Sequence, residues 1–119
     1  MKSLIIIPTY NERENILALA PEVRRATPDV DILVVDDNSP DGTQDVVREL
    51  QKKDAKLHLL ARPGKQGLGK AYLAGFAWGL AQGATELVEM DADFSHRPED
   101  LKKLLAALPA VDFAMGSRW

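Results

Sequence analysis

The sequence predicts a doubly wound α/β fold, in which helices cover both faces of a mostly parallel sheet. Five short apolar runs are distributed along the 119 residues. Between successive runs, apolar side chains recur at the spacing of an amphipathic helix. Strands that alternate with helices in this way form a parallel sheet with right-handed crossovers and three layers, α/β/α. No repeat, low-complexity tract or linker divides the chain, so we expect one domain, residues 1–119.

Each strand prediction rests on one apolar run that is bounded by polar or turn residues. The five candidate strands are Leu4 to Ile7, Ile32 to Val35, Leu57 to Leu60, Leu87 to Met90 and Val111 to Met115.

The first two helices are predicted after the first two strands. Asn11 is expected to cap the first helix, together with Glu14 three residues later. Thr43 begins the second helix after a turn that contains Pro40 and Gly42. The predicted core-facing residues are Ile16, Leu17, Leu19, Ala20 and Val23 in the first helix, and Val46, Val47 and Leu50 in the second.

Two further helices are predicted in the second half of the chain. The third runs from about Gly69 to Gln82, and Gly83 is expected to end it. The fourth begins at Pro98 with acidic residues in its first turn, where they favour the helix dipole. Its predicted core-facing residues are Leu101, Leu104, Leu105 and Leu108.

Composition limits the classes of function. Apolar residues make up 45% and charged residues 28% of the chain, as in a globular domain. The net charge of -3 does not indicate a surface that binds nucleic acid. No apolar run has the length of a bilayer span, and the N-terminus does not have the pattern of a signal peptide. The absence of Cys excludes disulfides and is compatible with a reducing cytosol.

Polar residues that are typical of ligand sites follow every predicted strand. They are Pro8 to Glu12, Asp36 to Ser39, Arg62, Asp91 with Asp93, and Gly116 to Arg118. Because the carboxyl ends of parallel strands lie at one edge of the sheet, we expect these groups to converge on one cleft.

Asp91 and Asp93 lie one residue apart, just past the apolar run that ends at Met90. Alternate carboxylates at the end of a buried strand can share one hard cation. Taken alone, an Asp-x-Asp pattern is more typical of an Asx turn before a helix. The convergence of polar groups at the same edge favours the metal site.

Five motifs in order along the chain resemble those of the inverting family 2 glycosyltransferases, which have a GT-A fold. Within that family they are most similar to dolichol-phosphate and polyprenol-phosphate mannosyltransferases. The conjunction of Ser39 to Thr43 with Asp91 to His96 is more specific than any single motif. The five motifs are Pro8 to Glu12, Val35 to Thr43, Gly67 to Tyr72, Met90 to His96 with Pro98 and Glu99, and Gly116 to Arg118.

The resemblance implies transfer of mannose from GDP-mannose to a dolichyl or polyprenyl phosphate, with Mg²⁺ or Mn²⁺ as cofactor. It implies that Asp91 and Asp93 hold the metal, and that Asp93 and Arg118 are catalytic. A cation there would neutralise the charge that develops on the departing diphosphate. The implied nucleotide-sugar-binding residues are Pro8, Tyr10, Glu12, Val35, Asp37, Asp91, Ala92, Asp93 and Arg118.

The sequence leaves two interpretations open for residues near the metal. Ser95 stands where some relatives have a Gln ligand, so it is either a metal contact, direct or through water, or a structural residue. His96 either forms a hydrogen bond near the metal or orients the turn before Pro98.

Residues near the nucleotide also have structural alternatives. Asp37 is expected to accept hydrogen bonds from ribose hydroxyls or a base edge. Asp36 either takes part in this recognition or holds the turn through backbone N–H groups. Pro8 either contacts the nucleotide or ends the strand, Glu12 either contacts the nucleotide or belongs to a helix cap, and Tyr10 is otherwise a packing residue.

Arg62 and Arg118 supply the positive charge that a site for several phosphates needs. As the second-to-last residue, Arg118 is alternatively a flexible terminal residue. No general base is evident, and none is needed if the acceptor is a phosphate monoester, which is already anionic.

Two other families fit the sequence less well. The segment Gly64 to Lys70 has the glycine and lysine spacing of a P-loop, but Ala71 replaces the hydroxyl residue that would bind Mg²⁺. A phospho-acceptor receiver domain would place its acidic pair after the first strand, whereas Asp36 and Asp37 follow the second.

Members of the resembled family continue beyond the position of Trp119 into an acceptor-binding region. The resemblance therefore implies the nucleotide-sugar-binding part of a GT-A domain, truncated on its C-terminal side. It also implies a cytoplasmic location, peripheral at the cytoplasmic membrane face, and an exposed sheet edge would favour a homodimer. Two alternative functions stay open: transfer of glucose or another sugar, and a non-catalytic nucleotide-sugar-binding module.

Overall fold

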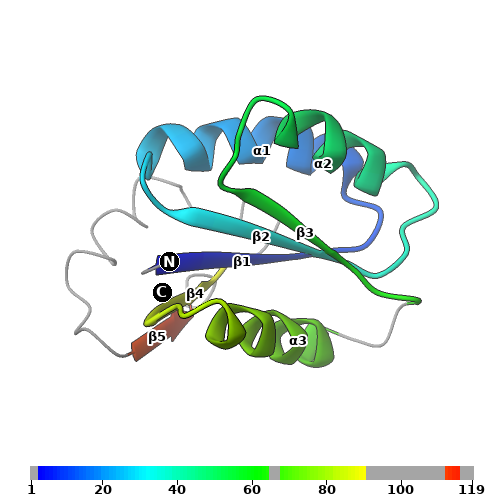
Figure 1. The fold of residues 1–119 in the computed structure, drawn as a ribbon. Coiled ribbons are helices and arrows are strands. Elements are labelled where there is room, and N and C mark those ends of the chain that lie inside the picture. The colour runs from blue at the N-terminus through cyan, green and yellow to red at the C-terminus, as the bar shows by residue number, and fades with distance from the viewer. Residues whose placement is uncertain (1–2, 65–67, 91–111, 116–119) are drawn as a thin grey trace.

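The computed structural model describes residues 3–64, 68–90 and 112–115, and within them it contains one parallel sheet (Figure 1). The strands are β1 (Ser3–Thr9), β2 (Asp31–Asp36), β3 (Leu57–Ala61), β4 (Glu86–Glu89) and β5 (Asp112–Met115). Their order is β3-β2-β1-β4-β5, and every neighbouring pair is parallel. The five predicted strands are confirmed.

Helices cover both faces of the sheet and make the three layers that the sequence predicts. Helices α1 (Arg13–Ala26) and α2 (Thr43–Gln51) lie on one face, and α3 (Leu68–Ala81) lies on the other (Figure 1). The fourth predicted helix, from Pro98, lies outside the described residues.

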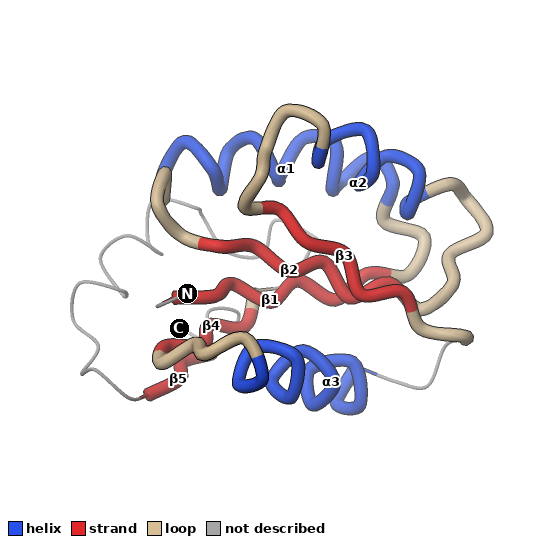
Figure 2. The backbone as a smooth tube through the Cα atoms, in the orientation of Figure 1, coloured by secondary structure: helices blue, strands red, loops and turns tan. Residues whose placement is uncertain are grey.

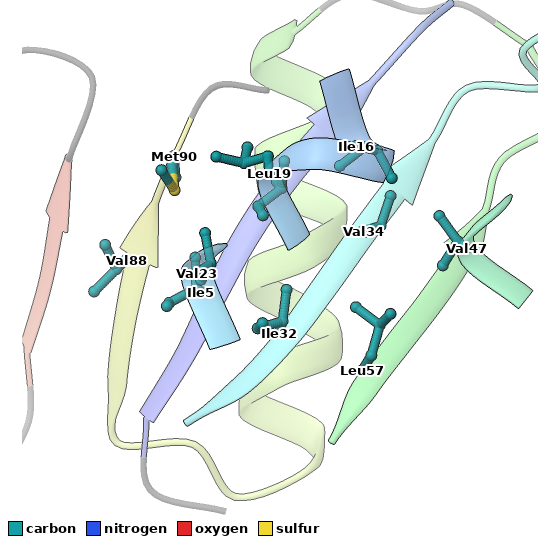
Figure 3. Close-up of a cluster of buried hydrophobic side chains, with 11 residues drawn as sticks. Ile5, Ile16, Leu19, Val23, Ile32, Val34, Val47, Leu57, Val88 and Met90 are labelled. Atoms are coloured by element: carbon teal, nitrogen blue, oxygen red, sulfur yellow. The ribbon is translucent and has the colours of Figure 1, made fainter. Parts of the chain in front are cut away.

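The central strands bury side chains on both faces, which is why their sequences are apolar throughout. Ile5, Ile32 and Val34 point toward α1, where they pack against Ile16, Leu19 and Val23 (Figure 3). The alternate residues of the same strands pack with Ala71 and Tyr72 of α3; they are Leu4, Ile6, Leu33 and Val35. The sheet is therefore a rigid support for the loops at its carboxyl edge.

The start of α1 differs from the prediction. The residue at the cap position is Glu12, no side chain caps the helix, and Asn11 has a left-handed backbone with φ of 56°. A residue with that φ turns the chain before the helix begins, so Asn11 cannot act as the predicted cap. The prediction that Leu17 faces the core is also wrong, because 53% of it is exposed.

The predictions for α2 and for the end of α3 are confirmed. In α2, Val47 is buried while Val46 and Leu50 pack at the edge of the core. Helix α3 ends two residues before Gly83, whose φ of 86° is the left-handed conformation that stops helices. Among the described residues, no helix is both long enough and apolar enough to cross a membrane.

Candidate functional site

The strand order reverses between β1 and β4, and this is the point where open α/β sheets bind ligands. The N–H of Met90 donates to the carbonyl of Ile6 at 2.9 Å, so the chain that leaves β4 is tied to β1. Asp91 is the next residue. The predicted metal and catalytic residues Asp91, Ala92, Asp93, Ser95 and Arg118 lie outside the described residues, as does His96.

Asp36 is fully buried at the end of β2 and is surrounded by donors. One carboxylate oxygen, Oδ1, accepts from the hydroxyls of Thr9 and Ser39, both at 2.6 Å. The other, Oδ2, accepts from the Ser39 N–H at 2.9 Å and the Gln44 amide at 2.8 Å. The structural interpretation of Asp36, that it holds the turn, is confirmed.

Asp37 lies at the same edge of the sheet and has a different partner. Its N–H donates to the carbonyl of Thr9 at 3.2 Å, and its Oδ1 lies 3.4 Å from Nη1 of Arg62. The Asp37 and Arg62 side chains are only 6% and 11% exposed. The guanidinium of Arg62 therefore forms an ion pair with the Asp37 carboxylate, and the role of Arg62 as a phosphate ligand stays a prediction.

The residues expected from the first loop occupy the end of β1 and the start of α1. Pro8 pairs with Val35 in the register of β1 and β2, so Pro8 does not end the strand. The Val35 side chain is fully buried, which leaves only its backbone for a ligand. Tyr10 is 36% exposed, and the Glu12 carboxylate accepts from the Asn15 amide at 2.8 Å.

The β1–α1 loop, residues 10–12, and the β2–α2 loop, residues 37–42, lie at one end of the sheet (Figure 2). They are joined by hydrogen bonds that the sequence analysis missed. The Asn11 N–H donates to the Ser39 hydroxyl at 2.8 Å, and the Arg13 N–H donates to Asp41 Oδ2 at 3.2 Å. The only sequence signal was the run of turn residues from Asn38 to Gly42, and such a run does not indicate which residues of another loop it bonds to.

Asp41 is held by donors from both sides. Burial, the largest single influence, raises its pKa, but hydrogen bonds from the Thr43 hydroxyl and from the N–H groups of Arg13 and Thr43 outweigh burial. The pKa of Asp41 is therefore lowered below the ordinary value of 3.8. The hydrogen bonds at this turn therefore favour the ionised carboxylate of Asp41.

The described residues line two hollows on the α1–α2 side of the sheet. The smaller, of about 320 Å³, is at the start of α1 and is lined by Glu12 among others. The larger, of about 580 Å³, lies between α1 and α2 and is lined by Leu17, Val46 and Leu50 with charged neighbours. None of the residues expected to bind the ligand lines the larger hollow, so we place the candidate site at the carboxyl edge and not in this groove.

No group of three or more His, Asp or Glu side chains able to hold a metal occurs in the part of the chain that the structure describes. The donor set that fits a hard divalent cation, Asp91 and Asp93, is carried by the segment that follows Met90.

Comparison with known sequences gives the family and related enzymes. The model of glycosyl transferase family 2 matches residues 4–119. The chain is 55% identical to a polyprenol monophosphomannose synthase of Mycolicibacterium smegmatis, over 99% of the chain and 45% of the relative. It is 52% identical to an undecaprenyl-phosphate mannosyltransferase of Micrococcus luteus, over 99% of the chain and 49% of the relative. The chain thus spans about half the length of these relatives.

A solved structure has a similar fold. It is a mannosyltransferase of Pyrobaculum calidifontis in complex with GDP-Man and Mn²⁺, with a TM-score of 0.60 and 24% sequence identity. The match covers 65% of this chain and 24% of that one, and it identifies the fold as GT-A-like. Since the family model matches nearly the whole sequence, and the parallel α/β sheet agrees with it, the chain belongs to glycosyl transferase family 2.

Proposed function

We propose that the chain is the donor-binding part of a mannosyltransferase that transfers mannose from GDP-mannose to a polyprenyl or dolichyl phosphate. The observation that carries the proposal is the 55% identity, over 99% of the chain, to a polyprenol monophosphomannose synthase. The position of Tyr10, Asp37 and Met90 at one edge of the sheet supports it, because a nucleotide sugar at that edge would reach all three.

The nucleoside would lie against the ends of β1 and β2. Asp37 would accept hydrogen bonds from ribose hydroxyls or a base edge, and the ion pair with Arg62 would hold its carboxylate in place. Tyr10, which is 36% exposed, and the Glu12 carboxylate at the start of α1 would contact the nucleotide from the first loop. Pro8 and Val35 would contact the nucleotide through their backbones.

The diphosphate would lie beyond the end of β4. Asp91 and Asp93 would hold Mg²⁺ or Mn²⁺, with Ser95 as a further contact, and Ala92 and Arg118 would complete the nucleotide-sugar site. When bound there, the cation would supply positive charge for the departing diphosphate.

The transfer step would be a single displacement. An oxygen of the acceptor phosphate attacks C1 of mannose while the bond from C1 to the GDP oxygen breaks, so GDP leaves and the configuration at C1 inverts. The acceptor phosphate is already anionic, so no side chain has to remove a proton. Asp93 and Arg118 would act on the charge of the two phosphate groups.

The proposed acceptor also indicates where the whole enzyme would work. A polyprenyl phosphate is a membrane lipid, so the whole enzyme would work at the cytoplasmic face of a membrane. The outer edges of β3 and β5 are the ends of the described sheet, and one of them would pair two copies in a homodimer.

The proposal is tested by calorimetric titration of the chain with GDP-mannose and with UDP-glucose, each with and without Mn²⁺. The same titrations are repeated on the Asp91→Ala plus Asp93→Ala double variant. We expect binding of GDP-mannose that requires Mn²⁺ and is lost in the double variant, because Asp91 and Asp93 would hold the cation that the diphosphate needs.

A matched control is Asp29→Ala plus Glu49→Ala, which removes two exposed carboxylates, one between α1 and β2 and one in the last turn of α2, away from the carboxyl edge of the sheet. This control should bind GDP-mannose like the wild type. Preferential binding of UDP-glucose would support transfer of another sugar. The absence of nucleotide binding by a folded chain would contradict the proposal.

A further inference from the structure

The Ser39 hydroxyl connects the two loops that would hold the nucleotide. It accepts a hydrogen bond from the Asn11 N–H at 2.8 Å and donates to Oδ1 of Asp36 at 2.6 Å. Asn11 belongs to the β1–α1 loop and Ser39 to the β2–α2 loop. A single hydroxyl thus joins segments that are 28 residues apart in sequence.

Asp36 fixes the position of that hydroxyl. Its carboxylate is fully buried and accepts from the N–H as well as the hydroxyl of Ser39. Thr9 and Gln44 occupy the remaining acceptor positions that the structure describes on this carboxylate. Because β1, the β2–α2 loop and α2 all contribute donors to this carboxylate, Ser39 cannot shift without breaking bonds to a buried charge.

The hydrogen bond from the Asn11 N–H to Ser39 lies where the backbone has a left-handed conformation. Asn11 has φ of 56°, a left-handed conformation that few residues other than Gly adopt at low cost. It lies between Tyr10 and Glu12, both expected to contact the nucleotide. The direction of the chain at Asn11 therefore sets where these two side chains lie relative to Asp37.

We propose that Ser39 is a positioning residue: held by Asp36, it fixes the backbone of Asn11 and so prearranges Tyr10 and Glu12 opposite Asp37 before the nucleotide binds. The inference rests on the proposed function and adds to it the residue that sets the geometry of the nucleoside subsite. The bond between the Arg13 N–H and Asp41 is a second connection, two residues further along each segment, between the start of α1 and the β2–α2 loop.

Prearrangement makes a prediction that a purely structural role does not. A loop that is free to rearrange must be ordered when the nucleotide binds, and that cost lowers the affinity. Removal of the Ser39 hydroxyl should therefore weaken nucleotide binding by about tenfold, beyond any change in stability. A hydroxyl that only stabilised the turn would change the free energy of unfolding and leave the affinity of the folded protein unchanged.

The test compares Ser39→Ala, Ser39→Thr and Thr27→Val with the wild type. Thr27→Val is the matched control, because the buried Thr27 hydroxyl donates to the Val23 carbonyl at 2.7 Å, at the far end of α1. Affinity for GDP-mannose with Mn²⁺ is measured by calorimetry, and exchange of the Asn11 amide hydrogen is measured by NMR in the free protein.

We expect Ser39→Ala to speed exchange of the Asn11 amide and to weaken GDP-mannose binding about tenfold. Ser39→Thr, which keeps the hydroxyl, should have the Asn11 exchange rate and the GDP-mannose affinity of the wild type. Thr27→Val should also leave both quantities unchanged. Wild-type affinity or unchanged Asn11 exchange in Ser39→Ala would overturn the inference and leave the proposed function standing. If the wild type itself binds no GDP-mannose, the proposed function fails and this inference falls with it, a result visible before any variant is compared.

Discussion

Asp36 and Asp37 are neighbours in the sequence, yet the strand geometry gives them different roles. Consecutive side chains of a strand point to opposite faces, so Asp36 points with Val34 toward α1 and α2. There its carboxylate accepts hydrogen bonds from Thr9 and Gln44, while Asp37 forms an ion pair with Arg62. One carboxylate organises the loops, and the other remains beside the candidate ligand site.

Replacement of Asp36 by Ala should strongly destabilise the fold. The change leaves the hydroxyls of Thr9 and Ser39 and the amide of Gln44 without their buried acceptor, and each buried unsatisfied donor costs about 1–3 kcal/mol. Allowing for relaxation and water entry, we expect a loss of about 3 kcal/mol in the free energy of unfolding, measured in urea.

The exposed Asp29 provides the control for this measurement. Asp29→Ala should change the free energy of unfolding by no more than about 0.5 kcal/mol. An equally small effect of Asp36→Ala would show that the buried hydrogen bonds of Asp36 do not hold the turn.

Asp41 gives the fold a dependence on pH with a defined sign. Its pKa is lowered in the folded protein from the ordinary value of 3.8, so the ionised form is favoured by folding. Its contribution to stability is therefore complete above pH 3.8 and disappears as the pH falls through the lower, folded pKa. Asp41→Asn removes this titration and keeps the shape of the side chain.

The measurement is the free energy of unfolding of the wild type and Asp41→Asn from neutral to acidic pH. We expect the wild type to be the more stable protein at neutral pH, with a difference that stays constant until the pH approaches 3.8 and then narrows. A difference that widens as the pH falls would mean that the pKa of Asp41 is raised on folding.

Helix α3 approaches the sheet through two glycines. A Cβ on Gly75 would lie 2.6 Å from Cγ2 of Ile6, and one on Gly79 would lie 2.7 Å from Cδ2 of Leu4. Ile6 and Leu4 are fully buried in β1, and the branched Ile6 side chain has few rotamers to escape into. The close contact of α3 with the sheet therefore requires glycine at these positions.

Gly75→Ala should destabilise the protein by about 1–3 kcal/mol, even though Ala is the better helix former by about 1 kcal/mol. Thermal or urea unfolding measures the effect. Gly69→Ala in the first turn of the same helix is the matched control, because a Cβ there has nothing within 4 Å. It should be neutral or stabilising, and a Gly75→Ala protein as stable as Gly69→Ala would contradict the packing.

The elements themselves were predictable because their signals are local. Apolar runs located all five strands, and the end of α3 followed from Gly83. The start of α1 was not predictable in the same way. The Asn11 backbone is turned by a bond to Ser39, 28 residues away, and the pattern of residues 11–14 contains no sign of that partner. Leu17 fits the helical period but sits where the groove between α1 and α2 opens.

The sheet as a whole explains why the location of the site could be predicted from the sequence, whereas the contacts between its side chains could not. A parallel α/β sheet places the residues after β1, β2 and β4 at one edge, whatever the loops look like. The pairing of Asp37 with Arg62 and the connections through Ser39 and Asp41 depend on the strand order β3-β2-β1. That order brings the loops together, and no local pattern encodes it.

The most direct test of a nucleotide-sugar site at this edge is to locate bound Mn²⁺ in solution. Mn²⁺ is paramagnetic, so in the presence of GDP-mannose it should broaden the amide NMR signals of residues near it. We expect the strongest broadening at Thr9, Asp37 and Met90, with little at Thr27 and Ala84, which lie at the opposite end of the sheet. Broadening centred on Leu17 and Leu50, in the groove between α1 and α2, would contradict a site at the carboxyl edge.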